Sequence, residues 1–587
     1  MKNSRFVFLA WVLAGVFLLP IPGRSEAKKK QSAEEESEAV RQVADRIIAR
    51  EDQVVQALST YHPRVESYLQ FVRPDSELGS VPVGDMYYLG RLELDKGVES
   101  ESFLPKSNAR SSFLPRFLTK AVSRPFKFNY NLDSLVEAAV VDPQGLDRKY
   151  YHYQFIRSEF LGDVRCLVFD LIPRPGAGSG RFKGRIWVED RDYTIVRFKG
   201  VRTRPPKFHV YYHFDSWRQN LQPGMWLPVF IYFEESGMTP PTLLSVSSDA
   251  KWFRAQTRFW GYDRSSADRE DELTRILVEA PAPVRDSSEG VELSPLASQR
   301  QWEAEAENNV LERLEKAGLI APRGEVDKVL ETVVNNLVVT NKLDNMPAIR
   351  CRVMLTLPIE SFTVGHTIVV SRGLIDVLPD EASLATVLAH ELAHLVLGHV
   401  TDTQFAFNDR LLIDDEDLLS ALDFERDTQQ EFAADTKALE LLRNSPYRNK
   451  LSTAGLFLRA MADEAPHLPQ MFGAHMGNRL AESGHDHRMV ELKTMAPELQ
   501  PREVDQVAAF PLGTRLKLDP WDGQVEMMKS KPAAPLSARE KMPFMVTPLF
   551  PHLTRMEATG SAPLTGEAKT GTAPSPSPDL RSNGRSQ

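Results

Sequence analysis

The sequence contains little cysteine, no large excess of charge of one sign, and no long apolar stretch beyond its N-terminus. Two cysteines, Cys166 and Cys351, are too few for a disulfide scaffold or a cysteine-based zinc site, although an oxidising compartment would allow one bridge between them. The net charge of -9 gives no reason to expect a nucleic-acid partner, because basic stretches interleaved with aromatic residues are missing. Without further apolar stretches, a multi-span membrane protein is excluded.

The N-terminus carries a targeting pattern. Two basic residues, Lys2 and Arg5, precede a nearly continuous apolar stretch (6–22), and small residues stand at a cleavage site that ends at Ala27. This pattern predicts a signal peptide of residues 1–27 and a periplasmic or otherwise exported protein. No cysteine follows the stretch, which excludes a lipoprotein anchor. An uncleaved membrane anchor is the alternative, because the stretch approaches the roughly 17 residues that can span a bilayer.

The remaining chain is too long for a single hydrophobic core, because such cores stop growing at about 250 to 300 residues. Residues 28–280 are expected to form one helix and an antiparallel sheet. From Glu34 to about Phe71, apolar residues recur at helical spacing, which predicts the helix. The predicted strands share polar and apolar alternation or aromatic and β-branched content, and they cover residues 87–94, 126–130, 150–156, 165–172, 182–188, 193–201, 208–214 and 226–233.

This first part is predicted to be a curved sheet with the helix on its apolar face, because its strands are short and regularly spaced. Residues 189–192 are typical of a hairpin turn between two strands. One helix followed by antiparallel strands is similar in layout to the half-barrel of bacterial lipoprotein-carrier proteins. The alternative is a generic sheet domain that supports or shields the rest, since fold does not imply function.

The second part changes to helical periodicity after a linker that is rich in proline, serine and acidic residues (281–298). A mainly helical domain with a small sheet is expected over residues 299–500, which makes the whole chain α+β. Its predicted helices cover 302–317, 325–339, 381–400 and 429–443, and its predicted strands cover 349–355 and 367–371. A C-terminal extension (501–557) and a disordered tail (558–587) complete the chain.

One predicted helix contains a metal-binding motif. Residues 389–400 have the sequence AHELAHLVLGHV, in which His390, Glu391 and His394 form H-E-x-x-H. Residues four apart lie on one helical face, so both imidazoles can bind one metal ion while Glu391 acts as a base toward the attacking water. The neighbouring residues are apolar, so the helix should be buried, and a metal ion would offset the several kcal/mol that burying these groups costs. A core helix with satisfied polar residues is the alternative.

A second predicted helix supplies carboxylates. Glu431 and Asp435 are one turn apart in the sequence EFAAD. A catalytic zinc needs a third protein ligand and an open fourth position, and Glu431 could complete the set. Asp435 could accept a proton from the outer nitrogen of a ligating histidine and fix its tautomer. Two exposed carboxylates on a helix are the alternative.

These segments resemble gluzincin metallopeptidases of peptidase family forty-eight, which include the CAAX prenyl protease, the HtpX heat-shock protease and BepA-type periplasmic quality-control proteases. The resemblance covers roughly residues 325–499 and rests on SFTVGHTIVVSRGLIDVLPDEASLATVLAHELAHLVLGH followed by EFAAD. It implies one zinc ion per chain, bound by His390, His394 and Glu431, with Glu391 as catalytic base. The chain lacks the spanning helices of the membrane members and the helical repeats of the BepA type.

The resemblance also implies roles for residues around this centre. Asp435 would orient a zinc ligand, and the strand within 361–371 would edge the cleft where substrate adds as an extended strand; an interior strand is the alternative. A histidine before an arginine-led helix would stabilise the oxyanion, and the matching region is 483–489. His485 is preferred and His487 is the second choice, although the region lacks the family's proline. Surface histidines are the alternative.

The expected function is zinc-dependent endopeptidase activity outside the cytoplasm, with protein or peptide substrates and envelope quality control as its setting. No nucleic-acid partner is expected, whereas envelope or outer-membrane proteins are possible partners. The alternative is a lipid-carrier-like or chaperone binding protein with a latent peptidase domain, since the sheet domain is large and the chain carries an export signal.

Overall fold

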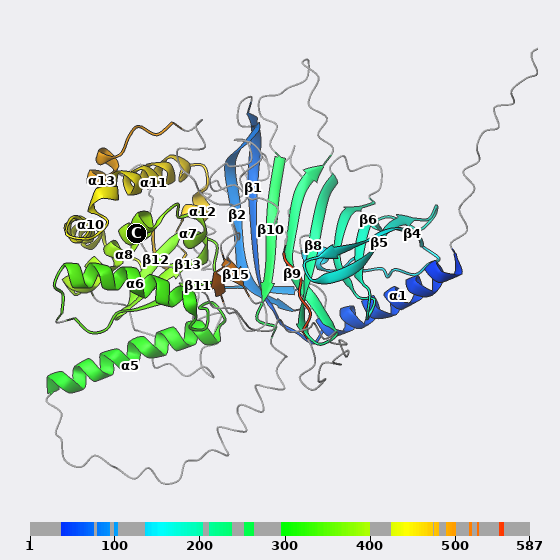
Figure 1. Cartoon of the computed structure of the whole chain (residues 1–587), viewed down its shortest axis with the longest axis horizontal. Helices are drawn as coiled ribbons and strands as arrows, with labels where there is room; N and C mark the ends of the chain where they lie inside the picture. Colours follow the sequence, from blue (N-terminus) through cyan, green and yellow to red (C-terminus); the bar gives the residue numbers. More distant parts are fainter. Residues whose placement is uncertain are drawn as a thin grey trace, which may run out of the picture.

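The fold is α+β in a computed structural model of the chain: a helix and a large antiparallel sheet precede a helical region with a small sheet (Figure 1). The described residues are 37–75, 79–93, 99–103, 136–203, 211–236, 252–262, 295–344, 346–399, 424–473, 475–479, 489–500, 516–518, 525–527 and 551–556. The predicted signal peptide, the predicted strand at 126–130, the predicted tail, His485 and His487 lie outside them.

Ten strands form the large sheet in the order β3-β2-β1-β10-β9-β8-β7-β6-β5-β4, and all neighbours are antiparallel. The strands are β1 (Arg64–Asp75), β2 (Gly79–Glu93), β3 (Glu99–Ser102), β4 (Tyr151–Leu161), β5 (Val164–Pro173), β6 (Phe182–Glu189), β7 (Ile195–Arg202), β8 (Tyr211–Gln222), β9 (Met225–Ser236) and β10 (Trp252–Trp260). The predicted turn at 189–192 lies where β6 passes into β7.

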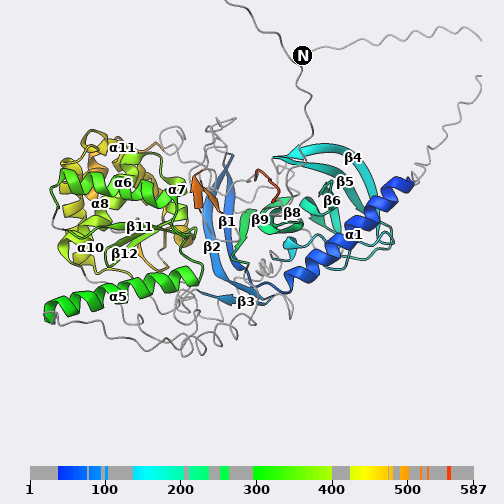
Figure 2. The ribbon, with the colours of Figure 1, turned by 60° about the horizontal axis from the view of Figure 1, so that its bottom comes forward.

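Helix α1 (Glu38–Leu58) runs along one face of this sheet (Figure 2). Ser37 begins it, since its side chain accepts a hydrogen bond from the N–H of Val40 at 3.3 Å. Its apolar stripe, which includes Ile47 and Val54, joins a buried cluster with strand residues such as Phe198. The helix therefore covers an apolar sheet face, as the sequence predicts.

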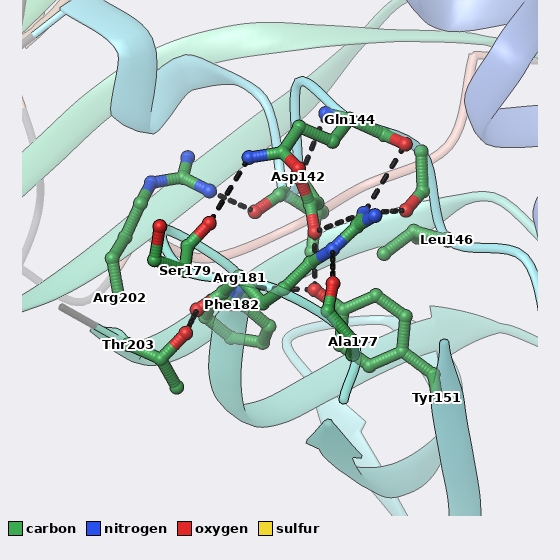
Figure 3. A network of polar contacts seen from close by, with 12 residues as sticks. Asp142, Gln144, Leu146, Tyr151, Ala177, Ser179, Arg181, Phe182, Arg202 and Thr203 are labelled. Atoms are coloured by element: carbon green, nitrogen blue, oxygen red, sulfur yellow. Dashed lines mark hydrogen bonds and ion pairs between the residues drawn. The ribbon is translucent and has the colours of Figure 1, made fainter. Parts of the chain in front are cut away.

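Buried ion pairs hold the segments that cover this face. The guanidinium of Arg218 on β8 donates to both carboxylate oxygens of Glu51 on α1, at 2.6 and 2.7 Å. Arg181 contacts the Asp142 carboxylate at 3.2 Å, and Tyr151 donates to the same carboxylate (Figure 3). These charges are paired and hydrogen-bonded, which is the condition for burying them.

The second part contains a four-stranded sheet in the order β11-β13-β12-β14. Its strands are β11 (Arg350–Met354), β12 (Glu360–Val364), β13 (Thr367–Ser371) and β14 (Asn478–Arg479). Its helices are α5 (Pro295–Lys316), α6 (Glu325–Thr340), α7 (Arg372–Val377), α8 (Glu381–Leu397), α10 (Thr428–Arg443), α11 (Leu451–Glu464), α12 (Pro469–Phe472) and α13 (Val490–Met495). A short hairpin, β15 (Leu516–Leu518) with β16 (Val525–Met527), follows.

The two parts pack against each other at the β1 and β2 end of the large sheet (Figure 1). Arg64 at the start of β1 donates to the carbonyl oxygen of Ala317 at 2.9 Å. The Trp260 indole donates to the Gly318 carbonyl at 2.8 Å, and the N–H of Leu357 donates to Glu66 at 2.6 Å. The contact therefore uses directed hydrogen bonds as well as apolar burial.

Several expectations need correction. The first helix ends at Leu58 rather than near Phe71, because Pro63 lacks an N–H and disfavours helical backbone at the residue before it, and β1 begins directly after it at Arg64. The predicted linker is too long, since α5 already begins at Pro295. Strands β1, β3, β10, β12, β14, β15 and β16 were not predicted. Both cysteines are free and buried. No helix among the described residues is long and apolar enough to cross a membrane.

Candidate metal centre

Helix α8 carries the H-E-x-x-H motif through the centre of the second part. Asp380 begins the helix by accepting the N–H of Ser383 at 2.8 Å, and Gly398 ends it with a φ of 71°. The motif side chains are buried: His390 is 1% exposed, and Glu391 and His394 are 0% exposed. Three buried ionisable side chains on a mostly apolar helix need polar partners.

Helix α10 packs beside α8 and brings Glu431 to the two histidines (Figure 1). The Nε2 atoms of His390 and His394 are 3.1 Å apart. Glu431 Oε2 lies 3.1 Å from His390 Nε2, and Glu431 Oε1 lies 3.5 Å from His394 Nε2. Within the described residues, this is the one cluster of three histidine, cysteine or acidic side chains close enough to share an ion.

The donor set fits zinc. Tetrahedral zinc with bonds of 2.0–2.1 Å to nitrogen and oxygen separates its ligand atoms by about 3.3 Å, and the three separations seen here lie on either side of that value. Two imidazole nitrogens and one carboxylate are also the ligands of known catalytic zinc sites that keep a position open. The three side chains are therefore close enough together to serve as a zinc ligand set.

Asp435 supports this set from the next turn of α10. Its Oδ1 atom lies 2.8 Å from His390 Nδ1, and its Oδ2 atom accepts the N–H of Met489 at 2.7 Å. Burial alone would lower the pKa of His390, but the Asp435 and Glu431 carboxylates outweigh it and raise the pKa to about 10. The surroundings of His390 thus favour positive charge.

Three further residues approach the centre and were not among the sequence candidates. His399 Nδ1 lies 2.7 Å from His394 Nδ1, so His399 orients the second imidazole. Ser361 on β12 is buried, and its hydroxyl donates to Glu391 Oε1 at 2.7 Å. His399 and Ser361 both lie within the segments that carry the family resemblance, but their contacts are apparent only in the folded chain.

Arg426 is the third of these residues, and it precedes α10. Its guanidinium donates to Thr363 Oγ1 on β12 at 3.0 Å. Burial lowers the pKa of Arg426, while the carboxylates of Glu391 and Glu431 act in the opposite direction. Nothing in the sequence marks this arginine, because its relation to the centre depends on how the segment before α10 crosses β12.

The strand predicted to edge the cleft is an interior strand. Residues 367–371 form β13, which pairs in parallel with β11 and antiparallel with β12. The neighbouring strand β12 carries Ser361 beside Glu391, and its other side pairs with β14 through residues 360 and 361. The prediction for 367–371 was wrong because a continuous β-rich run is typical of a strand that is buried on both faces.

Two histidines of α8 and Glu431 of α10 form a buried His-His-Glu set, and Glu391 of α8 lies beside it. This is the arrangement of a zinc metallopeptidase centre. The model of Peptidase family M48 matches residues 326–413, which include α8 and its motif. This match supports that peptidase family and a metallopeptidase activity for this part of the chain. No curated protein matches the sequence.

Solved structures that resemble part of the chain include the following three. A LolA superfamily protein from Nitrosomonas europaea has 13% identity and a TM-score of 0.20, with 38% of this chain and 96% of that chain covered. A DUF1329 family protein from Desulfovibrio piger has 13% identity and a TM-score of 0.17, with 40% and 98% covered. The Pseudomonas aeruginosa MucA/MucB complex has 9% identity and a TM-score of 0.14, with 37% and 94% covered. TM-scores at this level support no functional conclusion.

Proposed function

We propose that the chain is an exported, zinc-dependent endopeptidase that hydrolyses proteins in the periplasm or cell envelope as part of protein quality control. The observation that carries the proposal is the close approach of His390, His394 and Glu431 beside Glu391. The family match supports the peptidase class. The export pattern in residues 1–27 supports the location, and the resemblance to quality-control members motivates the role.

Each residue of the site has a separate role in the proposed reaction. His390, His394 and Glu431 would hold the zinc ion, which when bound supplies Lewis acidity toward the peptide carbonyl and the attacking water. Glu391 takes a proton from the water and delivers it to the leaving amine. Ser361 holds one oxygen of the Glu391 carboxylate and so fixes the orientation of the base.

The negative charge that develops on the scissile carbonyl needs a further positive or donor group. His485 remains the candidate from the resemblance. Arg426 is a second candidate, because its guanidinium is fixed on β12 and interacts electrostatically with Glu391. A peptide substrate would lie extended along β12, since this strand passes the catalytic base.

Replacement of Glu391 by glutamine tests the activity. The variant keeps the size of the side chain and leaves the three ligands in place, but it removes the base. We expect stoichiometric zinc and loss of casein cleavage, measured by metal analysis and fragment release. Glu440→Ala is the matched control, because Glu440 is an exposed glutamate on α10. Undiminished turnover by Glu391→Gln would refute the assignment.

The competing function is binding without cleavage, with the large sheet as a lipid-carrier-like or chaperone module. It is motivated by the size of the ten-stranded sheet and the helix that covers it. Incubation of the zinc-loaded protein with an unfolded substrate separates the two functions. A chaperone would suppress aggregation and release no fragments, whereas the proposed peptidase releases them.

A further inference from the structure

The side of β12 that faces away from β13 is where an extended substrate would add. Strand β13 occupies one side of β12, and Ser361 places β12 next to the catalytic base. An extended peptide binds a sheet edge through main-chain hydrogen bonds. In this structure the chain itself occupies that edge, because Asn478 pairs with Ser361 and Arg479 pairs with Glu360 in antiparallel register.

A buried carboxylate fixes the segment that leads into β14. Glu360 is 1% exposed, and its Oε2 atom accepts the N–H groups of His475, Met476 and Gly477 at 2.9, 3.1 and 3.2 Å. Hydrogen bonds to an ionised acceptor are stronger than those between neutral groups. The carboxylate thus binds three successive backbone amides of the chain at the cleft edge.

The close approach of this segment to β12 requires a glycine. A Cβ atom on Gly477 would lie 2.5 Å from the Phe362 ring and 2.9 Å from the Ser361 carbonyl oxygen. The backbone of the segment is therefore in direct contact with β12 in the region of the catalytic base. The next part of the edge is also covered, because Phe424 stacks on Phe362 and its N–H donates to the Met476 carbonyl at 2.8 Å.

The large sheet holds the same segment from the other side. Asp85 on β2 accepts the N–H groups of Gln470 and Met471 at 2.9 and 2.8 Å. The ring of Tyr87, two residues further along β2, packs on the ring of His475 with centroids 4.9 Å apart. Residues 470–471 and 475–477 are therefore fixed between the large sheet and the edge of the peptidase sheet.

We propose that residues 475–479, of which 478–479 form β14, act as an internal strand that blocks the substrate edge of β12, and that the large sheet holds this segment in place through Asp85 and Tyr87. This inference rests on the proposed peptidase function. Cleavage then requires the strand to leave β12, so the large sheet acts as a built-in regulatory element. A ligand or partner that loosens the β2 contact activates the enzyme.

The proposal has a kinetic signature. If substrate and the internal strand compete for one edge, the apparent KM exceeds the intrinsic value by the reciprocal of the open fraction, whereas kcat at saturation is unchanged. Loosening the strand should lower KM and leave kcat constant. A change in the catalytic groups would instead lower kcat.

Two variants loosen the strand from opposite sides. Asp85→Ala removes the acceptor on β2, and Gly477→Ala introduces the Cβ that β12 does not accommodate. Each has a matched control on β2. Met86→Ala truncates an exposed neighbour of Asp85, and Gly84→Ala adds a Cβ whose nearest contact is an ordinary 3.7 Å.

The first measurement is steady-state cleavage of an unstructured peptide by the zinc-loaded, full-length proteins. We expect KM to fall about tenfold in both loosening variants, with kcat unchanged, because removal of two charge-assisted hydrogen bonds or the addition of a clash can shift the open population by about that factor. Both controls should match the original chain. Unchanged KM in both loosening variants would overturn the proposal.

The second measurement is hydrogen exchange of the amides in residues 475–479, which needs no catalytic activity. Their exchange should be slow in the original chain and in the controls, and about tenfold faster in Asp85→Ala and Gly477→Ala. Equal exchange in all proteins would overturn the internal strand even if the protein cleaves peptides. Faster exchange in proteins that cleave nothing would support the strand and refute the peptidase function instead.

Discussion

Replacement of Asp435 by alanine should weaken zinc binding without removing a ligand. The Asp435 carboxylate has two tasks: Oδ1 fixes the His390 ring through Nδ1, and Oδ2 anchors the backbone at Met489. The variant loses both contacts. His390 is 1% exposed, so bulk water has little access to replace the missing acceptor, and the ring loses its preferred tautomer and orientation.

The size of the effect follows from this geometry. Loss of a carboxylate that orients a ligating histidine typically costs about 10 to 100-fold in metal affinity, or about 1.4 to 2.7 kcal/mol. We expect the upper end, because the 2.8 Å contact is short and buried. Asp435→Asn should cost less, since an amide oxygen can still accept from Nδ1. Glu431→Ala should abolish tight binding, because it removes a ligand.

Competition with a zinc chelator of known affinity measures these constants in the full-length protein. Glu440→Ala on the same helix is the control and should bind zinc like the original chain. The expected order of affinity is the control, then Asp435→Asn, Asp435→Ala and Glu431→Ala. Equal affinity of Asp435→Ala and the control would refute the orienting role, and stoichiometric zinc in Glu431→Ala would refute the ligand assignment.

Three further predictions concern the base, the oxyanion and the thiols. Ser361→Ala should lower kcat about tenfold or more with zinc retained, because the Glu391 carboxylate loses a fixed donor. Ser361→Thr should restore part of the rate. A kcat of Ser361→Ala equal to that of the original chain would exclude a role of Ser361 in positioning Glu391. Whichever of His485 and Arg426 stabilises the oxyanion should, as an alanine variant, lower kcat and kcat/KM together by about 100-fold; near-normal rates in both would exclude both. The thiols of Cys166 and Cys351 should resist alkylation at pH 8 until the chain unfolds, because burial raises their pKa values, to about 12 for Cys166; rapid native-state labelling would contradict this.

The elements whose residue types show a helical stripe or a β-rich composition could be predicted from the sequence. Helix α1 shows its apolar stripe, and strands such as β6 and β7 show aromatic and β-branched content. Strand β1 could not be predicted in this way, because both of its faces are covered. Its polar residues Arg64 and Glu66 point into the contact with the second part, where alternation no longer separates core from solvent.

At the metal centre, contacts between residues close in the sequence could be predicted, whereas contacts between distant residues could not. Spacing along one helix brings His390 and His394 together, so the motif predicts their proximity directly. Glu431 comes from a second helix, and the resemblance was needed to assign it as a ligand. The contacts of Ser361 and Arg426 depend on the path of β12 and of the segment before α10, which no spacing in the sequence encodes.

The contact between the two parts is too polar to be a simple apolar docking surface, and this favours a regulated arrangement. Burial raises the pKa of Glu66, although Arg258 and the N–H of Leu357 oppose the shift. Burying the charged Glu66 at this contact therefore costs free energy that an apolar side chain would not cost. Directed bonds of this kind fix the relative position of two surfaces more strictly than apolar packing does. Strand β2 can hold residues 470–471 and 475 at the cleft edge only if that position is fixed. Tyr87, whose ring packs on His475, donates its hydroxyl to Glu66 at 2.9 Å, so this buried carboxylate supports a residue that holds the segment.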